Sequence, residues 1–402
     1  MKKIKDSFKY IKFSDLLAPL LFVIALPFSL ILRLVNKWKN RELWLVCEEG
    51  KYARDNGYHF FKYIRTEHPD DYCFYVIDKN SKDYEKVKEY NNIIQFKSFK
   101  HWVFYLAAKF NISSQKNGNP NQIFFYIIHV VLGLFNNRVF LQHGVIKDMC
   151  EWLLYKNTKF RYFICGAKDE YEYVNNNYGY PEGHIQYTGL ARFDNLHDYD
   201  VDTKLILVIP TWRSWLGRET NSLAGQIDFT ETAFFKYWNS FLNNPEFINY
   251  IEKKYIKVVF YPHVNMQKYL KCFKVKSENI CLADMSVDIQ KVLKSAALMI
   301  TDYSSVFMDF AYMKKPIIYY QFDKEEYRSK QYVEGYFSYE KNGFGPVIEN
   351  EKKLVNYIIK NYNSYFFTED LYKKRMDSFF SLYDTRNCER QYKLLRNSKE
   401  VK

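Results

Sequence analysis

Two histidines in this 402-residue chain each come at the end of a short apolar run that is typical of a β-strand. His143 follows the run 139–142 and precedes a glycine, and His263 follows the run 256–261 through a proline. In α/β sheets, ligands bind at the carboxyl ends of the strands. An imidazole, with an ordinary pKa of about 6.5, can take a proton from a hydroxyl near neutral pH. Both histidines are therefore candidate catalytic residues, and a purely structural role for His143 stays open.

A polar turn between two apolar runs offers a second kind of chemistry. The stretch 298–322 predicts a strand, a turn that holds Asp302, Ser304 and Ser305, a helix that carries Asp309, and a second strand. A serine of this turn is well suited to cap the helix. The N–H groups and positive dipole end of such a helix bind phosphate. An ordinary capped helix is the alternative interpretation.

A third candidate is an arginine at the end of another predicted strand. Arg213 follows the run 205–209 through the residues Pro-Thr-Trp. Its planar guanidinium could clamp a phosphate with two hydrogen bonds, whereas a surface salt bridge is the simpler interpretation. The polar segment 214–230 that follows is expected to form a loop or lid.

These residues need two parallel sheets to position them. Predicted strands and helices alternate along most of the chain, which indicates the α/β class with doubly wound parallel sheets. We expect one Rossmann-like domain over residues 42–200 and a second over residues 201–385. Residues 386–402 are expected to be a C-terminal tail, and residues 1–41 a membrane-associating segment.

The N-terminal segment has the composition of a membrane-associating segment. Five lysines lie within residues 1–12, and the almost wholly apolar run 16–35 follows, interrupted by Pro19 and Pro27. Its length permits a spanning helix. The two prolines also suit a bent helix that enters and leaves one membrane face, and a buried soluble helix is the third alternative. Basic residues flank both sides, so charge gives no orientation.

A second apolar stretch, residues 122–135, predicts a buried helix. A membrane-contacting or acceptor-binding face is the alternative. His129 within this stretch is expected to be a packed side chain.

The composition favours an anionic partner in a reducing compartment. The formal net charge is +13, which suits a phosphorylated substrate or an anionic membrane, and no nucleic-acid-binding motif accompanies it. The seven cysteines form no CxxC pair, which indicates reduced thiols in the cytosol. No acidic pair suggests a bound metal.

Taken together, the motifs resemble those of the CDP-glycerol glycerophosphotransferase family of teichoic acid and capsule synthesis. The resemblance runs from about residue 43 to about residue 348. It implies a GT-B architecture, in which two Rossmann-like domains face each other across a cleft, with a membrane-associating N-terminal region. The motifs that carry it are ARDNGYHFFKY (53–63), QHG (142–144), GLARFD (189–194), PTWR (210–213), YPH (261–263) and ITDYSSVFMDF (300–310).

The resemblance also implies a reaction. The acceptor hydroxyl attacks the β-phosphorus of CDP-glycerol, CMP leaves, and glycerol phosphate joins a polyprenyl-diphosphate-linked or polysaccharide acceptor. His143 would be the general base, and His263 would bind the diphosphate or stabilise the leaving CMP. The two turn serines would hold the diphosphate, and Arg213 would oppose the negative charge of the transition state.

Supporting roles follow from the same resemblance. Asp302 and Asp309 would orient donor groups or their loop, and Lys147, Arg54 and Asp55 would lie on the acceptor side. CDP-glycerol is the only small molecule implied, with no metal and no further cofactor. A cytosolic nucleotide donor implies the cytoplasmic face of the cell membrane.

One motif departs from the pattern of many teichoic acid polymerases. The first histidine lies in LQHGVIKD (141–148), which is more similar to capsule-type members. The acceptor, the choice of glycerol over ribitol, and the number of units added therefore stay open. The alternatives are a CDP-ribitol phosphotransferase, a GT-B glycosyltransferase with another nucleotide donor, and a non-catalytic basic protein that coats anionic surfaces.

Overall fold

The computed structural model describes the whole chain except residues 1–11, 136, 218–227, 362–367 and 399–402. The lysine-rich start of the chain and most of the predicted lid therefore lie outside the described residues. Contacts divide the chain into two compact units. Unit 1 comprises Met1–Val145, Glu151–Asp194 and Asp384–Lys402, and unit 2 comprises Ile146–Cys150 and Asn195–Tyr383.

Unit 1 is built on a parallel sheet in the order β3-β2-β1-β4-β5-β6-β7. Its central strands are continuous apolar runs because helices cover both faces of the sheet. Helices α4 (Asn56–Glu67) and α18 (Asn387–Arg396) pack on one face, and α6 (Phe99–Ala107) and α7 (Gln122–Tyr126) pack on the other. Helix α3 (Ala18–Trp38) lies outside α6. The strands are β1 (Trp44–Cys47), β2 (Cys73–Ile77), β3 (Ile93–Gln95), β4 (Phe110–Ser113), β5 (Arg138–Phe140), β6 (Tyr162–Cys165) and β7 (Ile185–Tyr187).

The helices of unit 1 include short 3₁₀ segments and one π-helix. They are α2 (Phe13–Leu16), α3 (Ala18–Trp38), α4 (Asn56–Glu67), α5 (Tyr84–Lys88), α6 (Phe99–Ala107), α7 (Gln122–Tyr126), the π-helix η1 (Ile127–Val131), η2 (Glu151–Leu153), α8 (Tyr155–Thr158), α9 (Lys168–Asn177), η3 (Ala191–Asn195) and α18 (Asn387–Arg396).

Unit 2 repeats the plan with a parallel sheet in the order β10-β9-β8-β11-β12-β13. Its strands are β8 (Asp202–Val208), β9 (Lys257–Phe260), β10 (Ile280–Leu282), β11 (Ala296–Thr301), β12 (Ile317–Tyr320) and β13 (Val347–Ile348). Its helices are α10 (Ser214–Gly217), η4 (Phe229–Glu231), α11 (Ala233–Leu242), α12 (Pro245–Lys253), η5 (Val264–Cys272), α13 (Ile289–Ser295), α14 (Phe307–Tyr312), α15 (Lys324–Lys330), α16 (Glu351–Asn361) and α17 (Asp370–Phe379). Two Rossmann-like parallel sheets confirm the predicted fold class.

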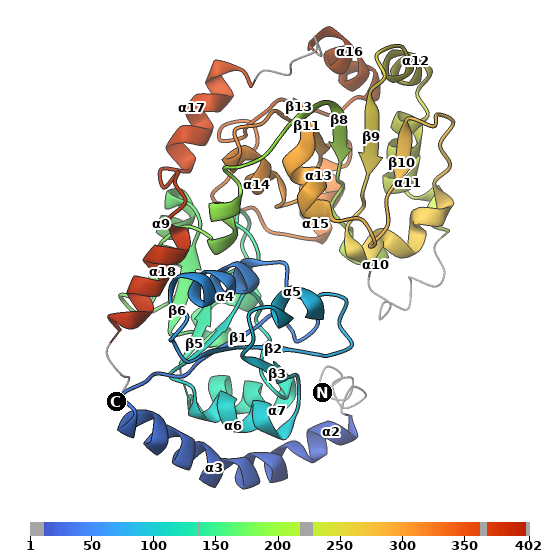
Figure 1. Cartoon of the computed structure of the whole chain (residues 1–402). Helices are drawn as coiled ribbons and strands as arrows, with labels where there is room; N and C mark the ends of the chain where they lie inside the picture. The colour runs from blue at the N-terminus through green and yellow to red at the C-terminus, as the bar shows by residue number, and fades with distance from the viewer. Residues whose placement is uncertain (1–11, 136, 218–227, 362–367, 399–402) are drawn as a thin grey trace. The chain divides into compact units, whose positions relative to one another are not determined.

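The N-terminal apolar helix is present as α3, and it lies along the outside of α6 (Figure 1). Only a narrow stripe of the helix is buried, and it includes Ala25 and Ser29. The guanidinium of Arg33 donates to the carbonyl of Leu106 at the end of α6. Among the described residues, this is the one helix long and apolar enough to cross a membrane. Because most of its apolar side chains are exposed, the alternative of a buried soluble helix does not fit.

The second apolar stretch differs from the buried helix predicted for residues 122–135. It forms α7 followed by the π-helix η1, and much of its apolar surface is exposed. Phe125, Ile128 and His129 face the core. The side chains that are at least two-fifths exposed are Ile123, Tyr126, Ile127, Val131, Leu132 and Leu134. The prediction of a wholly buried helix is therefore wrong, whereas His129 is indeed packed and bonds Tyr105 Oη at 2.9 Å.

The last described helix, α18, lies within the segment predicted to be a C-terminal tail, and it packs on unit 1. The backbone N–H groups of Asn387 and Cys388 both donate to the carboxylate of Asp194 at 2.9 Å. Gly189 makes room for this helix, because a Cβ there would strike the side chain of Asn387. The tail prediction for residues 386–402 thus missed a helix that belongs to the core of unit 1.

Candidate active site

The strongest candidate for proton chemistry is a histidine–aspartate pair in unit 1. The Nδ1 atom of His143 lies 2.5 Å from a carboxylate oxygen of Asp55. The other oxygen of Asp55 accepts from Arg192 at 2.8 Å, and Arg192 also donates to the carbonyl of His143 at 2.7 Å. The histidine side chain is 71% exposed, whereas the aspartate side chain is 12% exposed. Asp55 therefore orients the imidazole ring through Nδ1, which leaves Nε2 for a substrate.

The backbone turns abruptly just before this histidine. Gln142 has a φ of 66°, a left-handed conformation that costs free energy in a residue with a side chain. Its side-chain amide is buried and donates to the carbonyl of Ile164 at 2.7 Å and to Glu170 at 2.9 Å. Asn56 donates to its carbonyl at 2.8 Å. These bonds hold the strained turn and so fix the direction of the His143 side chain.

A buried glutamate holds the other member of the pair. Glu48 follows β1 directly, and its carboxylate accepts from the backbone N–H groups of Arg54, Asp55 and Tyr58 at 2.6–3.2 Å. The hydroxyl of Ser114 donates to the same carboxylate at 3.3 Å. Glu48 thus anchors the start of α4, which carries Asp55.

The electrostatics of the pair suit a general base. The negative charge of Asp55 raises the pKa of His143 above its ordinary value. Burial acts against ionisation of Asp55, but the charges of His143 and Arg192 hold its pKa below the usual range. Burial and the charge of Asp55 raise the pKa of Glu48 to about 7.

The serine turn of unit 2 is shaped differently from the predicted cap. Helix α14 begins at Phe307, and its N-cap residue is Val306, which makes no side-chain capping bond, so the expected cap by a serine is not formed. The Ser304 hydroxyl accepts the N–H of Val306 itself, at 3.4 Å. The carbonyls of both serines instead accept from the first helical residues in a tight turn. Among the described residues, the N–H groups of the two serines have no hydrogen-bond partner, and Ser305 is exposed. Both N–H groups are therefore unpaired in the described chain, and that of Ser305 is the more accessible one, because Ser304 is only 7% exposed.

The position of Arg213 does not fit a direct phosphate clamp. Its side chain is fully buried, and it pairs with Asp302 at 2.9 Å and with Asp323 at 2.8 Å. The rings of Tyr303 and Tyr327 lie on its guanidinium. Burial opposes the charge, but the two carboxylates raise the pKa of Arg213. Arg213 thus stabilises the serine turn from within the core of unit 2. Asp302 links that turn to Thr211, whose N–H group it accepts at 2.8 Å.

His263 lies at the end of β9, where the sequence predicted it. Its Nδ1 accepts the N–H of Asn265 at 3.2 Å, and its ring stacks on Trp212 with centroids 5.9 Å apart. Because Nδ1 accepts, a neutral ring carries its proton on Nε2 and can donate it to a ligand.

The remaining predicted site residues have structural partners. Arg54 bonds Asp83 through Nε at 2.5 Å. Lys147, predicted on the acceptor side, belongs to unit 2, where it is buried against Asp148 and over the ring of Tyr339. Asp309 is buried within α14.

Sequence reasoning missed Glu48, Arg192 and Asp323. Two of these had a usable signal, since Glu48 directly follows a strand and Arg192 lies inside the motif GLARFD. Asp323 comes three residues beyond the end of β12, and nothing in the sequence pairs it with Arg213.

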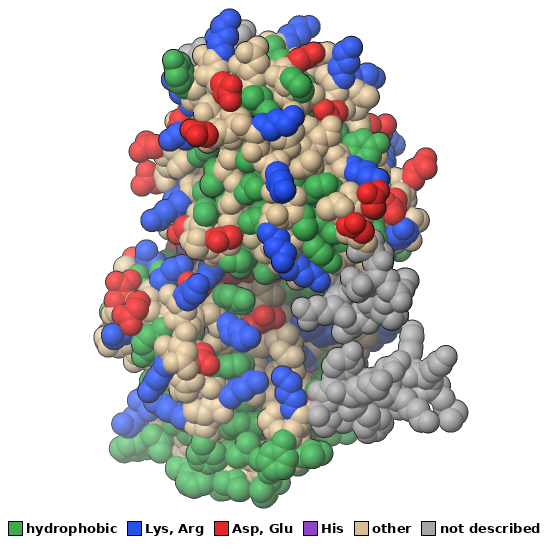
Figure 2. Space-filling model, turned by 90° about the vertical axis from the view of Figure 1, so that its right-hand side faces the viewer, with side chains coloured by type: hydrophobic (Ala, Val, Ile, Leu, Met, Phe, Trp, Pro, Cys, Tyr) green, Lys and Arg blue, Asp and Glu red, His purple; other side chains and the backbone are tan. Residues whose placement is uncertain are grey.

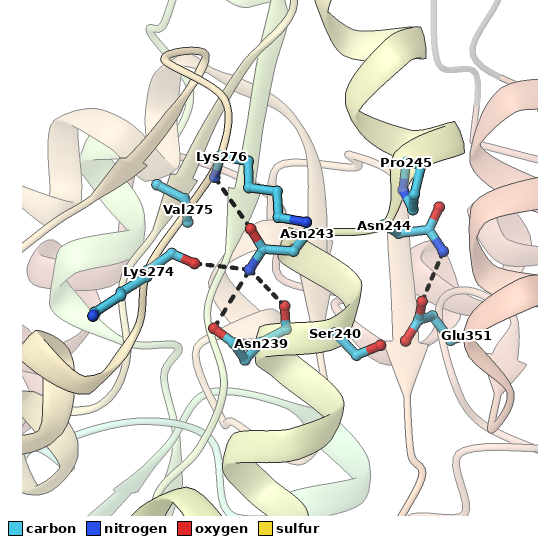
Figure 3. A pocket seen from close by; sticks show the side chains of 9 residues that line it. All are labelled: Asn239, Ser240, Asn243, Asn244, Pro245, Lys274, Val275, Lys276 and Glu351. Atoms are coloured by element: carbon cyan, nitrogen blue, oxygen red, sulfur yellow. Dashed lines mark hydrogen bonds between the residues drawn. The ribbon is translucent and has the colours of Figure 1, made fainter.

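Two further features bear on ligands. No group of three His, Cys, Asp or Glu side chains that could hold a metal occurs among the described residues. A cavity of about 410 Å³ lies in unit 2, between the end of α11 and the loop 274–276 (Figure 3). Asn243 lines it and bonds the carbonyl of Asn239, the carbonyl of Lys274 and the N–H of Lys276. The cavity contains none of the predicted site residues.

Two Rossmann-like parallel sheets with polar side chains at their strand ends define a protein of the GT-B-like fold class. The family model described as CDP-Glycerol:Poly(glycerophosphate) glycerophosphotransferase matches residues 28–397. The chain therefore belongs to this family, which confirms the family predicted from the six motifs.

Individual relatives come from teichoic acid synthesis. The chain is 33% identical over 379 residues to the minor teichoic acid biosynthesis protein GgaB of Bacillus subtilis (strain 168); the match covers 92% of this chain and 41% of that protein. It is 25% identical to the teichoic acid poly(glycerol phosphate) polymerase of Bacillus spizizenii, over 84% of this chain and 88% of the relative. This chain thus spans less than half of GgaB.

Solved structures show the same fold. The wall teichoic acid polymerase TagF superposes with a TM-score of 0.63 at 15% identity, over 96% of this chain and 98% of that one. A UDP-GlcNAc 2-epimerase of Methanocaldococcus jannaschii superposes with a TM-score of 0.52 at 13% identity, over 89% of this chain and 100% of that one.

Proposed function

We propose that this protein transfers glycerol phosphate from CDP-glycerol to a hydroxyl group of a cell-envelope polymer or its lipid-linked precursor, and releases CMP. Family membership supports the donor, and a CDPG-soaked variant of TagF is among the similar structures. The observation that carries the proposal is the exposed His143 ring held by Asp55 at 2.5 Å. A protein that only coats anionic surfaces has no need of such an oriented base.

The proposed step uses the two nitrogens of His143 differently. The Nδ1–H group donates to Asp55, so Nε2 carries the free lone pair. Nε2 takes the proton of the acceptor hydroxyl while its oxygen attacks the β-phosphorus of CDP-glycerol. The bond from that phosphorus to the bridging oxygen breaks, and CMP leaves with the electron pair. Asp55 and Arg192 keep the ring in place as it becomes an imidazolium.

The donor is proposed to bind in unit 2 at the serine turn. The free N–H groups of Ser304 and Ser305 would donate to the diphosphate, and His263 would donate from Nε2. Such preorganised donors stabilise the charge that spreads over the phosphoryl oxygens in the transition state. Arg213 contributes by holding the turn, because its donors already bind carboxylates and the carbonyl of Thr211.

We also propose that unit 1 lies on the cytoplasmic face of the membrane through an in-plane apolar surface. Figure 2 shows hydrophobic side chains gathered at the end of unit 1 formed by α3. Exposed side chains of α3 include Leu20 at 57% and Ile31 at 58%. Because the opposite stripe of α3 packs on α6, the helix is better placed to lie in the interface than to leave the protein and span the bilayer. Co-sedimentation with phosphatidylcholine vesicles measures this, and a chain that stays in the supernatant contradicts it.

The experiment that tests the function is a donor comparison. Purified protein is supplied with a membrane or polymer acceptor extract and with CDP-glycerol, CDP-ribitol or a nucleotide sugar. We expect nucleotide release that requires the acceptor and is fastest with CDP-glycerol. Fastest turnover with CDP-ribitol would mean that CDP-ribitol, not CDP-glycerol, is the donor. Turnover with a nucleotide sugar alone would refute the proposed phosphotransferase function.

The pH dependence of the reaction is expected to report the charge of Asp55. Since this charge raises the pKa of His143, kcat/KM should fall as pH drops through a value above 6.5, where Nε2 becomes protonated. In Asp55→Asn the acidic limb should move to lower pH, and the plateau should fall about a hundredfold because the ring loses its orientation.

The control for this profile is Glu85→Gln, which removes an exposed carboxylate elsewhere in unit 1. Glu48 also titrates in this range, and the loss of the Asp55 charge would lower its pKa as well, so the profile of Glu48→Gln is measured to separate the two titrations. An acidic limb at the same pH in the unaltered enzyme and in Asp55→Asn would contradict the assignment of His143 as the base.

A further inference from the structure

Unit 1 buries one arginine without a carboxylate partner. Arg138 begins β5, is 8% exposed, and lies over the ring of Phe160. One terminal nitrogen donates to the carbonyl of Thr158. The Nε–H group is buried and has no hydrogen-bond partner in the described chain, and no carboxylate forms an ion pair with the guanidinium there. Arg138 therefore keeps unused donors inside the protein.

The two other arginines that are buried in the described part of the chain both have carboxylate partners, unlike Arg138. Arg192 pairs with Asp55, and Arg213 pairs with two carboxylates. Burying an unpaired charge is unfavourable, and a guanidinium cannot lose its proton to escape the cost. A buried arginine with free donors is thus expected where an anion arrives from outside the chain.

The free side of Arg138 lines a small polar pocket. The void is about 20 Å³, which is room for one water molecule or one phosphoryl oxygen. Its wall is formed by the face of β4 and β5 and by the loop that follows β4. The polar side chains of that wall are Asn111, Ser113, Gln115, Lys116, Asn117 and Asn119.

A second cation joins Arg138 at this pocket. Lys116 is half-buried, and burial together with the charge of Arg138 lowers its pKa. Its Nζ donates to the carbonyl of Trp152 at 3.3 Å and lies over the ring of Tyr126. The nearby carboxylate of Glu49 accepts from Asn117 at 3.3 Å. Two positive charges thus lie at one pocket, and no carboxylate of the described residues forms an ion pair with either.

The pocket lies between the apolar surface and the catalytic pair. Tyr126, beside Lys116, belongs to α7 and is 46% exposed among other exposed apolar side chains. The side chain of Trp152 is 48% exposed. Tyrosine and tryptophan favour the headgroup level of a membrane. On the other side, the amide nitrogen of Gln115 lies 3.0 Å from Nδ1 of His143.

We propose that Arg138 and Lys116 form a subsite for a lipid-borne phosphate, one of whose oxygens enters the pocket while the apolar chain stays in the membrane. This proposal rests on the proposed function, since it gives the acceptor lipid a place beside the proposed base. Bulk anionic phospholipid offers the same chemistry, and the two sources are separated by experiment.

The test measures binding of the full chain to three kinds of vesicle in the absence of any donor. The vesicles are phosphatidylcholine alone, phosphatidylcholine with a polyprenyl diphosphate, and phosphatidylcholine with phosphatidylglycerol. The variants are Lys116→Gln and Arg138→Gln, and the control is Lys62→Gln, an exposed lysine of α4. We expect each subsite variant to weaken binding to phosphate-carrying vesicles by about tenfold or more, with Lys62→Gln within about twofold of the unaltered chain.

Loss confined to the polyprenyl diphosphate vesicles identifies the acceptor lipid as the ligand, and loss on both anionic vesicles identifies phospholipid headgroups. If both variants bind every vesicle like the control, the pocket holds only water and the proposal is refuted. Because Arg138 is buried, its replacement could unfold the protein, so circular dichroism is used to check that Arg138→Gln is folded. If that variant is unfolded, binding by Lys116→Gln alone decides whether the proposal holds. No donor is present, so this outcome is independent of whether CDP-glycerol is the substrate.

Discussion

Replacing His143 by alanine is expected to lower kcat for CMP release from CDP-glycerol by about a thousandfold, with little change in stability. The loss follows from removing the base that takes the acceptor proton, a contribution that ranges from about 10² to 10⁴ in enzymes. Stability should change little because the side chain is 71% exposed. The measurement is initial CMP release at saturating donor, beside thermal unfolding of both proteins.

A suitable control is His68→Ala, which removes a histidine of the same unit that stacks on Tyr392 and lies in none of the motifs. We expect this control to keep its turnover within about twofold of the unaltered enzyme. Residual activity of His143→Ala above a tenth of the unaltered rate would remove the general-base assignment. The donor site would then remain as the source of catalysis.

Replacing Arg213 by methionine is expected to destabilise unit 2 by about 4 kcal/mol. Methionine fills a similar volume but leaves Asp302 and Asp323 buried without a cation. Burial already raises the pKa of Asp302 even beside the arginine, so an isolated carboxylate there would be strongly disfavoured. Denaturant unfolding gives the free energy, and CMP release should fall together with the folded fraction.

Two comparisons identify the cause of that loss. The variant Arg213→Met with Asp302→Asn and Asp323→Asn removes the unpaired charges and should recover more than half of the stability. Lys324→Met, which breaks an exposed pair with Glu340 in the same unit, should cost less than about 0.5 kcal/mol. If Arg213→Met is fully stable but has lost donor binding, Arg213 contacts phosphate directly after all.

Much of the site could be predicted from the sequence because the ends of strands are marked by local patterns of apolar and polar residues. His143 and His263 follow apolar runs, and the structure has both at strand ends. The turn with Ser304 and Ser305 was likewise visible as a polar break between a strand and a helix. In each case, neighbouring residues determine the position along the sheet.

The errors came from features that depend on distant residues. Arg213 was expected to reach a phosphate, but Asp323, more than a hundred residues away, takes its donors. The expected serine cap failed because the chain enters α14 through a tight turn. The stretch 122–135 has apolar residues on all sides, so its pattern could not show which side would face the core and which would remain exposed.

The return of α18 to unit 1 has a consequence for the order in which the protein is made. The core of unit 1 includes Cys388 and Leu395, packed with Trp44 and Phe60 near the other end of the chain. A ribosome finishes every strand of unit 2 before it makes these residues. The synthesis of unit 1 therefore begins first and ends last. Until α18 has been made, part of the apolar core of unit 1 stays exposed in the growing chain. A fragment cut at residue 200 would remain in that unfinished state.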